Sequence, residues 1–234
     1  MYGASGRICH TWRAHGKNAA AYDIKEGGAL HDVTSEAGFF TLLNLALQLA
    51  PGGLIVGGPP CSLFIFLSSS FHKRRAGNAL GDTSKLPVRL ANTIVENTLV
   101  LLEVVHKRSV WFVLEQPASS WMFKLPLVVE VFARLGWARG GCQPGVRPIC
   151  VWMGAYGHEL PKCSHLVGTL PTLSAMRRPC PLHLRSREAR PAMWRRTSTG
   201  VQGGRDLPSA AEYTSSFCSA LYVAWLGAAC HVPS

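Results

Sequence analysis

The sequence lacks any apolar run long enough to cross a membrane as a helix. Its longest apolar stretches, residues 39–50 and 217–230, fall short of the ~20 residues that a spanning helix needs. No secretory signal opens the chain, because Met1 leads straight into a turn of small residues. The 8 cysteines form no dense framework, which argues against a disulfide scaffold. These absences predict a soluble, intracellular protein without a membrane partner, with nucleus and cytoplasm both open.

Acidic residues are scarce, since 13 Asp and Glu stand against 24 Lys and Arg and give a net charge of +11. This imbalance favours a polyanionic partner, most simply nucleic acid, although many basic proteins never touch DNA. The composition, 47% hydrophobic and 16% charged, is not that of a disordered chain, and 234 residues suffice for one well-packed domain. Nothing in it indicates an obligate protein partner.

A cysteine follows the clearest strand of the sequence. The apolar run at residues 54–56 is short and flanked by glycines, which is typical of a strand covered on both faces. Pro59 and Pro60 cannot continue a sheet ladder, so they hold Cys61 in a stiff turn beyond the strand end. Ligands of open α/β sheets bind at this edge. This stretch alone is equally consistent with a nucleophilic cysteine and a structural one.

An acid ends the next buried strand. The apolar run at residues 110–117 ends in Glu115, Gln116 and Pro117. An acid at a strand end that faces a cleft is suited to proton donation. The Pro-Pro-Cys turn and, one helix later, this glutamate together resemble the catalytic motifs of the DNA cytosine-5 methyltransferases. Gln116 and Pro117 stand where that family has Asn-Val.

The resemblance implies a fold and a mechanism. The fold is α/β and Rossmann-like, with a mostly parallel central sheet and helices on both faces, and the cofactor is S-adenosylmethionine, with no metal. Cys61 is implied to be the catalytic nucleophile that attacks C6 of a cytosine in DNA. Glu115, also catalytic, is implied to hold N3 and the exocyclic amine of that base. Positive charge from residues 73–75 would help to ionise the thiol.

The amino-terminal residues resemble the first cofactor motif of the family. Tyr2, Ala4 and Gly6 occupy its key places, but Ala4 replaces a glycine, and the strand that should precede the loop is absent because the chain begins there. We therefore expect either an upstream truncation or an incomplete cofactor site. The resemblance assigns three more residues to the cofactor: Asp23, at the end of a strand expected over residues 19–24, to the ribose hydroxyls, Asp32 to the adenine amine, and Pro59.

Basic residues gather at candidate nucleic-acid contacts. The long connection after Cys61, residues 62–83, resembles the family's loop that closes over the flipped base. The basic, proline-rich segment at residues 176–199 lies where the family places its target-recognition region, but it is far shorter. The residues expected to contact phosphates or bases are Lys73, Arg74, Arg75, Arg147, Arg177 and Arg178.

Hydrophobic periodicity predicts helices over residues 8–15, 35–49, 90–104, 119–136 and 209–229, and strands over 19–24, 54–56, 110–117 and 142–156. Three regions follow from this order. Residues 1–162 are expected to form the methyltransferase core, and residues 163–208 a reduced target-recognition segment. Residues 209–234 are expected to form a helix that packs back on the core.

Other functions stay open. The altered first motif and the short recognition segment also fit a catalytically inactive domain that only binds nucleic acid. The basic tail fits RNA as well as DNA, so a methyltransferase that acts on RNA or on a protein is a further alternative. A zinc site is disfavoured because the spacing of its candidate ligands is irregular; these are Cys163, His165, Cys180 and His183.

Overall fold

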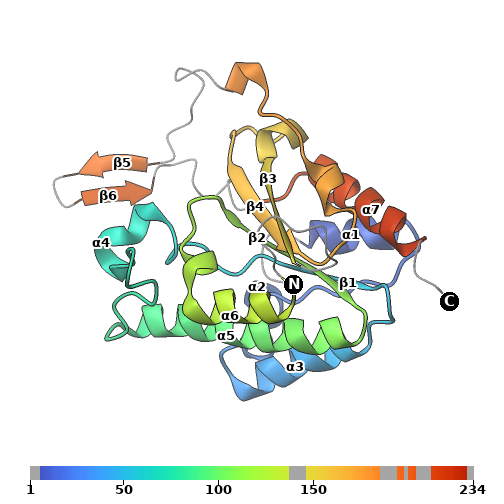
Figure 1. The fold of residues 1–234 in the computed structure, drawn as a ribbon, viewed down its shortest axis with the longest axis horizontal. Coiled ribbons are helices and arrows are strands. Elements are labelled where there is room, and N and C mark those ends of the chain that lie inside the picture. The colour runs from blue at the N-terminus through green and yellow to red at the C-terminus, as the bar shows by residue number, and fades with distance from the viewer. Residues whose placement is uncertain (1–5, 137–145, 185–193, 198–199, 204–211, 231–234) are drawn as a thin grey trace.

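The computed structural model of the chain describes residues 6–136, 146–184, 194–197, 200–203 and 212–230. These residues form an α/β fold around a four-stranded mixed sheet (Figure 1). In the order β1-β2-β4-β3, the sheet contains β1 (Leu54–Gly57), β2 (Trp111–Pro117), β4 (Cys163–Gly168) and β3 (Arg147–Trp152). β1 and β2 pair in parallel, and the other two pairs are antiparallel. A separate sheet pairs β5 (Trp194–Thr197) with β6 (Gly200–Gly203).

Helices cover both faces of the four-stranded sheet (Figure 1). α1 (Arg7–Ala14) and α7 (Ser215–Ala229) pack together on one face. α5 (Leu86–Lys107) and α6 (Pro126–Arg134) lie on the other, with α3 (Glu36–Leu47) packed against α5. The shorter helical turns are α2 (Ile24–Gly27), η1 (Gly28–His31), η2 (Phe66–Ser68), α4 (Ser69–His72), η3 (Met122–Lys124), η4 (Met153–Tyr156), η5 (Leu173–Met176) and η6 (Leu182–Leu184).

Local sequence decides where the main helices begin. The Ser35 hydroxyl accepts a hydrogen bond from the Gly38 amide at 3.0 Å and caps α3, and the Thr214 hydroxyl caps α7 in the same way. α5 and α6 instead begin with a proline in the first turn, where the missing N–H costs no hydrogen bond. The capping residues therefore fix the boundaries that the periodicity leaves approximate.

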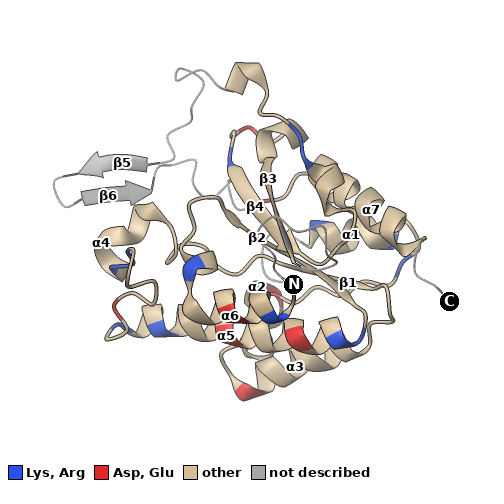
Figure 2. Cartoon of the chain, viewed as in Figure 1, with Lys and Arg blue, Asp and Glu red and all other residues tan. Residues whose placement is uncertain are grey.

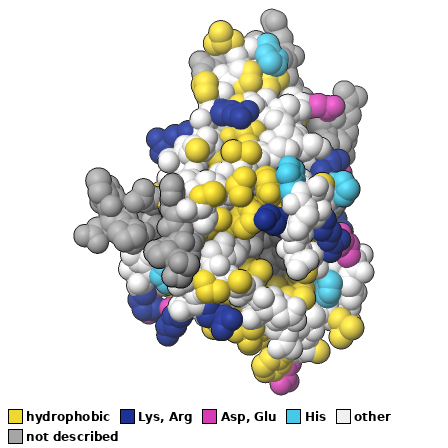
Figure 3. All heavy atoms as spheres, turned by 90° about the vertical axis from the view of Figure 1, so that its right-hand side faces the viewer, with side chains coloured by type: hydrophobic (Ala, Val, Ile, Leu, Met, Phe, Trp, Pro, Cys, Tyr) yellow, Lys and Arg dark blue, Asp and Glu magenta, His cyan; other side chains and the backbone are white. Residues whose placement is uncertain are grey.

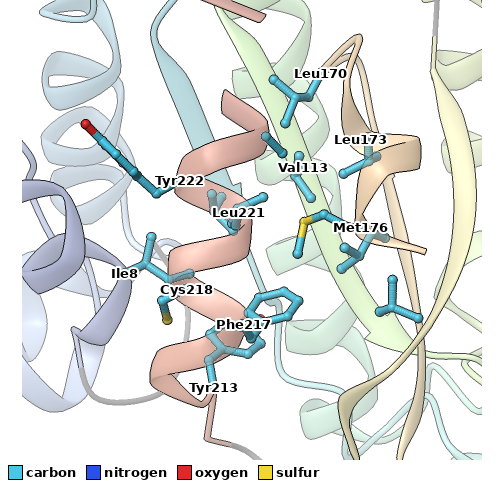
Figure 4. Close-up of a cluster of buried hydrophobic side chains, with 14 of the residues drawn as sticks. Ile8, Val113, Leu170, Leu173, Met176, Tyr213, Phe217, Cys218, Leu221 and Tyr222 are labelled. Atoms are coloured by element: carbon cyan, nitrogen blue, oxygen red, sulfur yellow. The ribbon is translucent and has the colours of Figure 1, made fainter. Parts of the chain in front are cut away.

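The side chains of β2 divide the core between the two faces, because neighbouring side chains of a strand point in opposite directions. Val113 packs in the cluster that α1 and α7 cover, whereas Phe112 and Leu114 pack in the cluster under α5 and α6. Figure 4 shows Phe217 and Leu221 of α7 on the same side of the sheet as Val113. A strand that is buried on both faces explains why the run at residues 110–117 is almost continuously apolar.

Most predicted elements are confirmed, but one strand is wrong. The helices predicted over residues 8–15, 35–49 and 90–104 and the strands over 54–56 and 110–117 are found. The helix predicted over 119–136 is confined to α6, and the last helix begins at Ser215. Residues 19–23 form no strand, and Asp23 instead caps α2. Three consecutive alanines favour a strand weakly, and no strand of the described residues pairs with them.

The sheet also differs from the mostly parallel arrangement that we expected. β4 lies between β2 and β3 and is antiparallel to both, so β1 and β2 form the parallel pair of a mixed sheet. Residues 163–168, which were expected to begin the reduced target-recognition segment, thus belong to the sheet. The buried apolar residues Leu166 and Val167 explain why this stretch packs inside the fold.

Charge and apolar side chains are unevenly distributed over the surface. Figure 2 shows acidic side chains on the layer formed by α3, α5 and α6, with basic side chains among them. On the face that Figure 3 shows, hydrophobic side chains gather across the middle, with basic and histidine side chains around them. Within the described ranges, no helix is long and apolar enough to cross a membrane. Acidic and basic side chains are mixed on the layer of α3, α5 and α6, where Arg134 pairs with Glu103 and Glu130.

Candidate active site

The parallel pair β1 and β2 brings Cys61 and Glu115 to the same edge of the sheet. Their register aligns Gly57, the last residue of β1, with Leu114, so the Cys61 turn follows β1 where Glu115 lies on β2. The side chain of Glu115 is buried, with the residue only 6% exposed, and Cys61 is half-buried. The two residues that the sequence predicts to be catalytic thus lie at the carboxyl ends of neighbouring strands.

The turn before Cys61 is tied to β2 by a buried amide. Gln116 Nε2 donates a hydrogen bond to the carbonyl oxygen of Pro59 at 2.5 Å, and the Ser120 hydroxyl donates to Gln116 Oε1 at 2.9 Å. Gln116 and Ser120 are buried, so water does not compete for these hydrogen bonds. The turn that carries Cys61 is therefore held at a fixed distance from the strand that carries Glu115.

Two side chains from distant parts of the chain converge on Glu115. The Tyr213 hydroxyl donates a hydrogen bond to Glu115 Oε2 at 3.2 Å, and Lys162 Nζ lies 3.3 Å from Glu115 Oε1. The Lys162 side chain is only 13% exposed. Among the described residues, Oε1 accepts no hydrogen bond of normal geometry, so its contact with Lys162 is an ion pair and leaves a lone pair available. A ligand that donates hydrogen bonds fits this position.

The electrostatics of Cys61 reflect these neighbours. Burial raises the pKa of the Cys61 thiol above its usual value; the Lys162 ammonium opposes this shift, and the Glu115 carboxylate adds to it. Burial also raises the pKa of the Tyr213 hydroxyl well above its usual value, and Glu115 adds to that shift. Both groups are therefore protonated at neutral pH. The Cys61 thiol has to lose its proton before it can act as a nucleophile.

The connection after Cys61 is held together from inside by Arg74. Its guanidinium donates to the carbonyl oxygens of Leu63 at 2.7 Å and Ala79 at 2.6 Å and to Asn92 Oδ1 at 2.9 Å, and it lies over the Phe64 ring. Arg74 is only 4% exposed. The expectation that it contacts a phosphate is therefore corrected, because its donors are used to anchor the connection on α5.

The other basic candidates lie in several places. Lys73 and Arg75, on either side of Arg74, are exposed, as are Arg177 and Arg178 after η5. The Arg178 guanidinium lies 4.5 Å from the centre of the Tyr156 ring. Arg147 begins β3, but its side chain lies outside the described part of the structure. Four of the six candidates thus face solvent, where a polyanion can reach them.

The candidate cofactor residues are partly described. Tyr2 and Ala4 lie outside the described residues. Gly6 adopts a left-handed conformation, with φ of 57°, directly before α1. Asp23 Oδ1 accepts a hydrogen bond from the Lys25 amide at 2.9 Å, and Asp32 Oδ1 accepts from the amide and the hydroxyl of Thr34. Asp23 and Asp32 therefore take part in local turns, whereas Cys61 and Glu115 are positioned by the sheet.

Sequence reasoning missed Lys162 and Tyr213 as members of this site. Lys162 directly precedes β4, whose antiparallel register with β2 places Ser164 opposite Pro117. Tyr213 falls within the helix predicted over residues 209–229, but it precedes α7 and combines a buried ring with a hydroxyl that donates to Glu115 Oε2. A tyrosine hydroxyl ahead of the apolar series Phe217, Leu221 and Trp225 was the available signal for Tyr213, whereas no sequence signal indicated that β4 pairs with β2.

Comparisons with known proteins add no further constraint, because no family model, no curated protein and no solved structure matches the chain. Within the described residues, no group of three or more His, Cys, Asp or Glu side chains could hold a metal ion, and the zinc pattern at Cys163 and Cys180 assembles no such group. The side chains of the site are therefore what indicates its chemistry.

Proposed function

We propose that the protein is an S-adenosylmethionine-dependent methyltransferase of the cytosine-5 type, built on a Rossmann-like core and acting on cytosine in DNA. The observation that supports this proposal best is the position of Cys61 and Glu115 at the carboxyl ends of the parallel strands β1 and β2. A nucleophile and an acid at that edge match the two motifs on which the resemblance depends. The buried Gln116 that joins their two strands strengthens the match.

In the proposed mechanism, the Cys61 thiol gives its proton to solvent, and the thiolate sulfur forms a bond to C6 of the cytosine as the electron pair of the C5–C6 double bond moves toward C5. Glu115 takes a proton from solvent and donates it to N3, while its other oxygen accepts a hydrogen bond from the exocyclic amine, and so it stabilises the negative charge that develops at C5. Lys162 and Tyr213 hold the Glu115 carboxylate in place, and the Lys162 ammonium favours the thiolate form of Cys61. C5 then gains a methyl group and loses its proton as the bond to sulfur breaks. Reaching C6 requires the base to leave the stack.

The cofactor residues that are described fit this proposal. S-adenosylmethionine, when bound, supplies the methyl group that C5 accepts. Gly6 precedes α1 without a side chain, so the first amides of the helix are accessible to the polar end of a nucleotide-like ligand. Built on Gly6, a Cβ would lie 3.6 Å from Glu26 Oε1 in α2, the helix that Asp23 caps. Gly6 and α2 are thus neighbours.

Four exposed basic side chains support a nucleic-acid substrate. Lys73 and Arg75 lie on the connection that follows Cys61, and their exposed side chains can contact a phosphate. Arg177 and Arg178 add a second exposed pair. Phosphate contacts position a nucleic acid without reading its sequence, so these residues fit DNA and RNA equally well.

The test is transfer of a labelled methyl group to duplex DNA, single-stranded DNA and RNA, together with covalent trapping on an oligonucleotide that carries 5-fluorocytosine. Fluorine at C5 cannot leave as a proton, so the enzyme–DNA adduct accumulates. Cys61→Ser is expected to abolish both transfer and trapping, because the hydroxyl is a far weaker nucleophile. The matched control is Cys230→Ser, since Cys230 is an exposed cysteine at the end of α7.

Two results would contradict the proposal. Normal turnover by the Cys61→Ser variant would rule out the covalent mechanism. Salt-dependent binding of nucleic acid without calorimetric binding of S-adenosylmethionine would identify the inactive, nucleic-acid-binding alternative. Transfer confined to RNA would keep the chemistry and change the substrate.

A further inference from the structure

Two cysteines lie side by side on the antiparallel strands β3 and β4. The register of the two strands places Cys150 opposite His165 and Cys163 opposite Trp152, so the cysteines are diagonal neighbours across the ladder. Because residues two apart on a strand share a face, both side chains lie on the same side of the sheet. The structure places Cys150 Sγ 2.6 Å from Cys163 Sγ. The fold therefore brings two thiols from different strands into direct contact.

The backbone around this pair is held on both sides. The Cys163 carbonyl oxygen accepts a hydrogen bond from the Ala118 amide at 3.0 Å, and the Lys162 carbonyl oxygen accepts from the Met153 amide at 2.9 Å. Ala118 follows β2 and Met153 follows β3, so the start of β4 is hydrogen-bonded to both neighbouring strands. A covalent bond between two sulfur atoms is about 2.05 Å long, so a small side-chain movement suffices to form one here. The strands can keep their pairing when it forms.

The two thiols differ in their access to solvent. Cys150 is exposed, whereas Cys163 is half-buried. Burial raises the pKa of the Cys163 thiol, and the neighbouring Cys150 thiol adds to this shift. Cys163 is therefore protonated at neutral pH, and Cys150 is the sulfur that a dissolved oxidant meets first. An accessible cysteine beside a second thiol is typical of a redox-sensitive pair.

We propose that Cys150 and Cys163 form a reversible disulfide within one chain when the protein meets hydrogen peroxide. Cys150 gives its proton to solvent, and its sulfur attacks one peroxide oxygen. The O–O bond breaks, which leaves a sulfenic acid on Cys150 and a hydroxide that takes up a proton to become water. The Cys163 sulfur then bonds to the Cys150 sulfur, and the hydroxyl of the sulfenic acid leaves with the Cys163 proton as a second water. Both sulfurs are oxidised, and the peroxide is reduced.

The bond closes a loop between two residues that are 13 positions apart in the chain. This loop contains η4 and Lys162, whose ammonium group contacts Glu115. Oxidation thus joins β3 to the first residue of β4, directly after Lys162. The inference does not rest on the proposed methyltransferase activity, because it concerns the two thiols alone.

The test oxidises the full folded chain with a stoichiometric amount of hydrogen peroxide. The remaining thiols are blocked with N-ethylmaleimide, and the linked peptides are identified by mass spectrometry. The bond between Cys150 and Cys163 is expected to exceed every other cysteine pair by about tenfold or more, because these sulfurs are already in contact in the folded protein. Oxidation in concentrated urea is expected to remove this preference. Dithiothreitol is expected to restore both thiols by thiol–disulfide exchange.

Three variants test the assignment. In Cys163→Ser, oxidation of Cys150 is expected to stop at the sulfenic acid, which dimedone labels. Cys230→Ser is the matched control, since Cys230 is also exposed, and it should form the bond as the unmodified chain does. The Cys61→Ser chain, which the proposed mechanism makes inactive, should form it too. The result for the disulfide is therefore separate from the result for methyl transfer.

Three results would overturn the proposal. One is an unmodified chain in which Cys150 stops at the sulfenic acid or is oxidised further without a bond to Cys163. Another is a bond between Cys163 and Cys180, whose thiol also influences Cys163 electrostatically. The third is a disulfide between two copies of the protein, which would increase with protein concentration.

Discussion

The two edges of β1 are very different. Toward β2, the turn at Cys61 is tied down by the buried Gln116, and Arg74 anchors the connection that follows. On the other side, across an apolar groove of about 360 Å³ that Ile8, Leu42 and Val56 help to line, residues 17–32 contain no strand, and Tyr22 packs under α3 and donates from its hydroxyl to the Gly38 carbonyl. One side of the candidate site is thus fixed by sheet pairing, and the other side consists of local turns.

This difference predicts that the residues on the two sides of β1 differ in local stability. Side chains held by a sheet ladder and buried amides are fixed by the global fold. Asp23 and Asp32 are fixed by neighbours within two residues, and a turn of that kind opens at little cost. We therefore expect substitutions on the β2 side to affect the whole molecule, and those beyond the groove to have smaller, local effects.

The largest effect is expected for Arg74→Ala. This change leaves two carbonyl oxygens and Asn92 without their charged donor inside the connection, so the free energy of unfolding should fall by about 3 kcal/mol. Urea denaturation measures it. Arg75→Ala is the control, since Arg75 is exposed and should change stability by less than about 0.5 kcal/mol. Equal losses for the two variants would show that the connection does not depend on the buried guanidinium.

A smaller effect is expected beyond the groove, at Asp23. Asp23→Ala removes the cap of α2 and should lower the free energy of unfolding by about 1 kcal/mol. Asp23→Asn keeps an oxygen that can accept from the Lys25 amide, so it should lower stability much less. Thermal denaturation of both variants checks this. A loss in Asp23→Ala as large as that of Arg74→Ala would remove the contrast between the two edges.

The smallest effect is expected from the Tyr213 hydroxyl at high pH. Burial raises the pKa of the Tyr213 hydroxyl in the folded state above the unfolded value of about 10. The stability that depends on the protonated hydroxyl is therefore complete below the unfolded pKa and is lost as pH rises toward the folded pKa. Between pH 8 and pH 10.5, Tyr213→Phe should therefore lose about 0.8 kcal/mol less stability than the unmodified chain. Guanidinium denaturation at the two pH values measures this difference.

Tyr222→Phe is the control for that measurement, since Tyr222 is also largely buried on α7 but is not directed at Glu115. It shows what the loss of one tyrosine hydroxyl from this part of the fold does to the measurement. If Tyr213→Phe lost as much stability between the two pH values as the unmodified chain, the hydroxyl directed at Glu115 would not be the group that stays protonated in the folded state.

The sequence was sufficient where short-range signals define an element. The glycines and prolines around residues 54–60 define β1 and its turn, and Ser35 marks the start of α3, whereas the cap of α7 at Thr214 was not recognised and its helix was predicted to begin at residue 209. It also allowed the meeting of Cys61 and Glu115 to be predicted, because residues at the carboxyl ends of adjacent parallel strands lie at one edge. These inferences need only the pattern of residues along the chain.

Features that depend on partners far away in the sequence could not be predicted. No residue pattern in 163–168 indicates that β4 lies between β2 and β3. This strand order places Lys162 next to Glu115, so the contact could not be predicted. Arg74 resembled its exposed neighbours, and its burial depends on Asn92 in α5. The strand expected over residues 19–24 was wrong, because no described strand is close enough to pair with these residues. The groove separates them from the edge of β1.

The packing of the first helix against the last has a consequence for folding. The hydrogen bond from Arg7 to the Tyr213 carbonyl closes a loop of 206 residues, and α7 supplies much of the apolar cover over β3 and β4. Contacts so distant in sequence slow the folding of a chain. During synthesis, Ile8 and Trp12 emerge long before their partners on α7 exist. One whole face of the sheet therefore stays open until the last helix is made, and aggregation of the nascent chain would begin on that face.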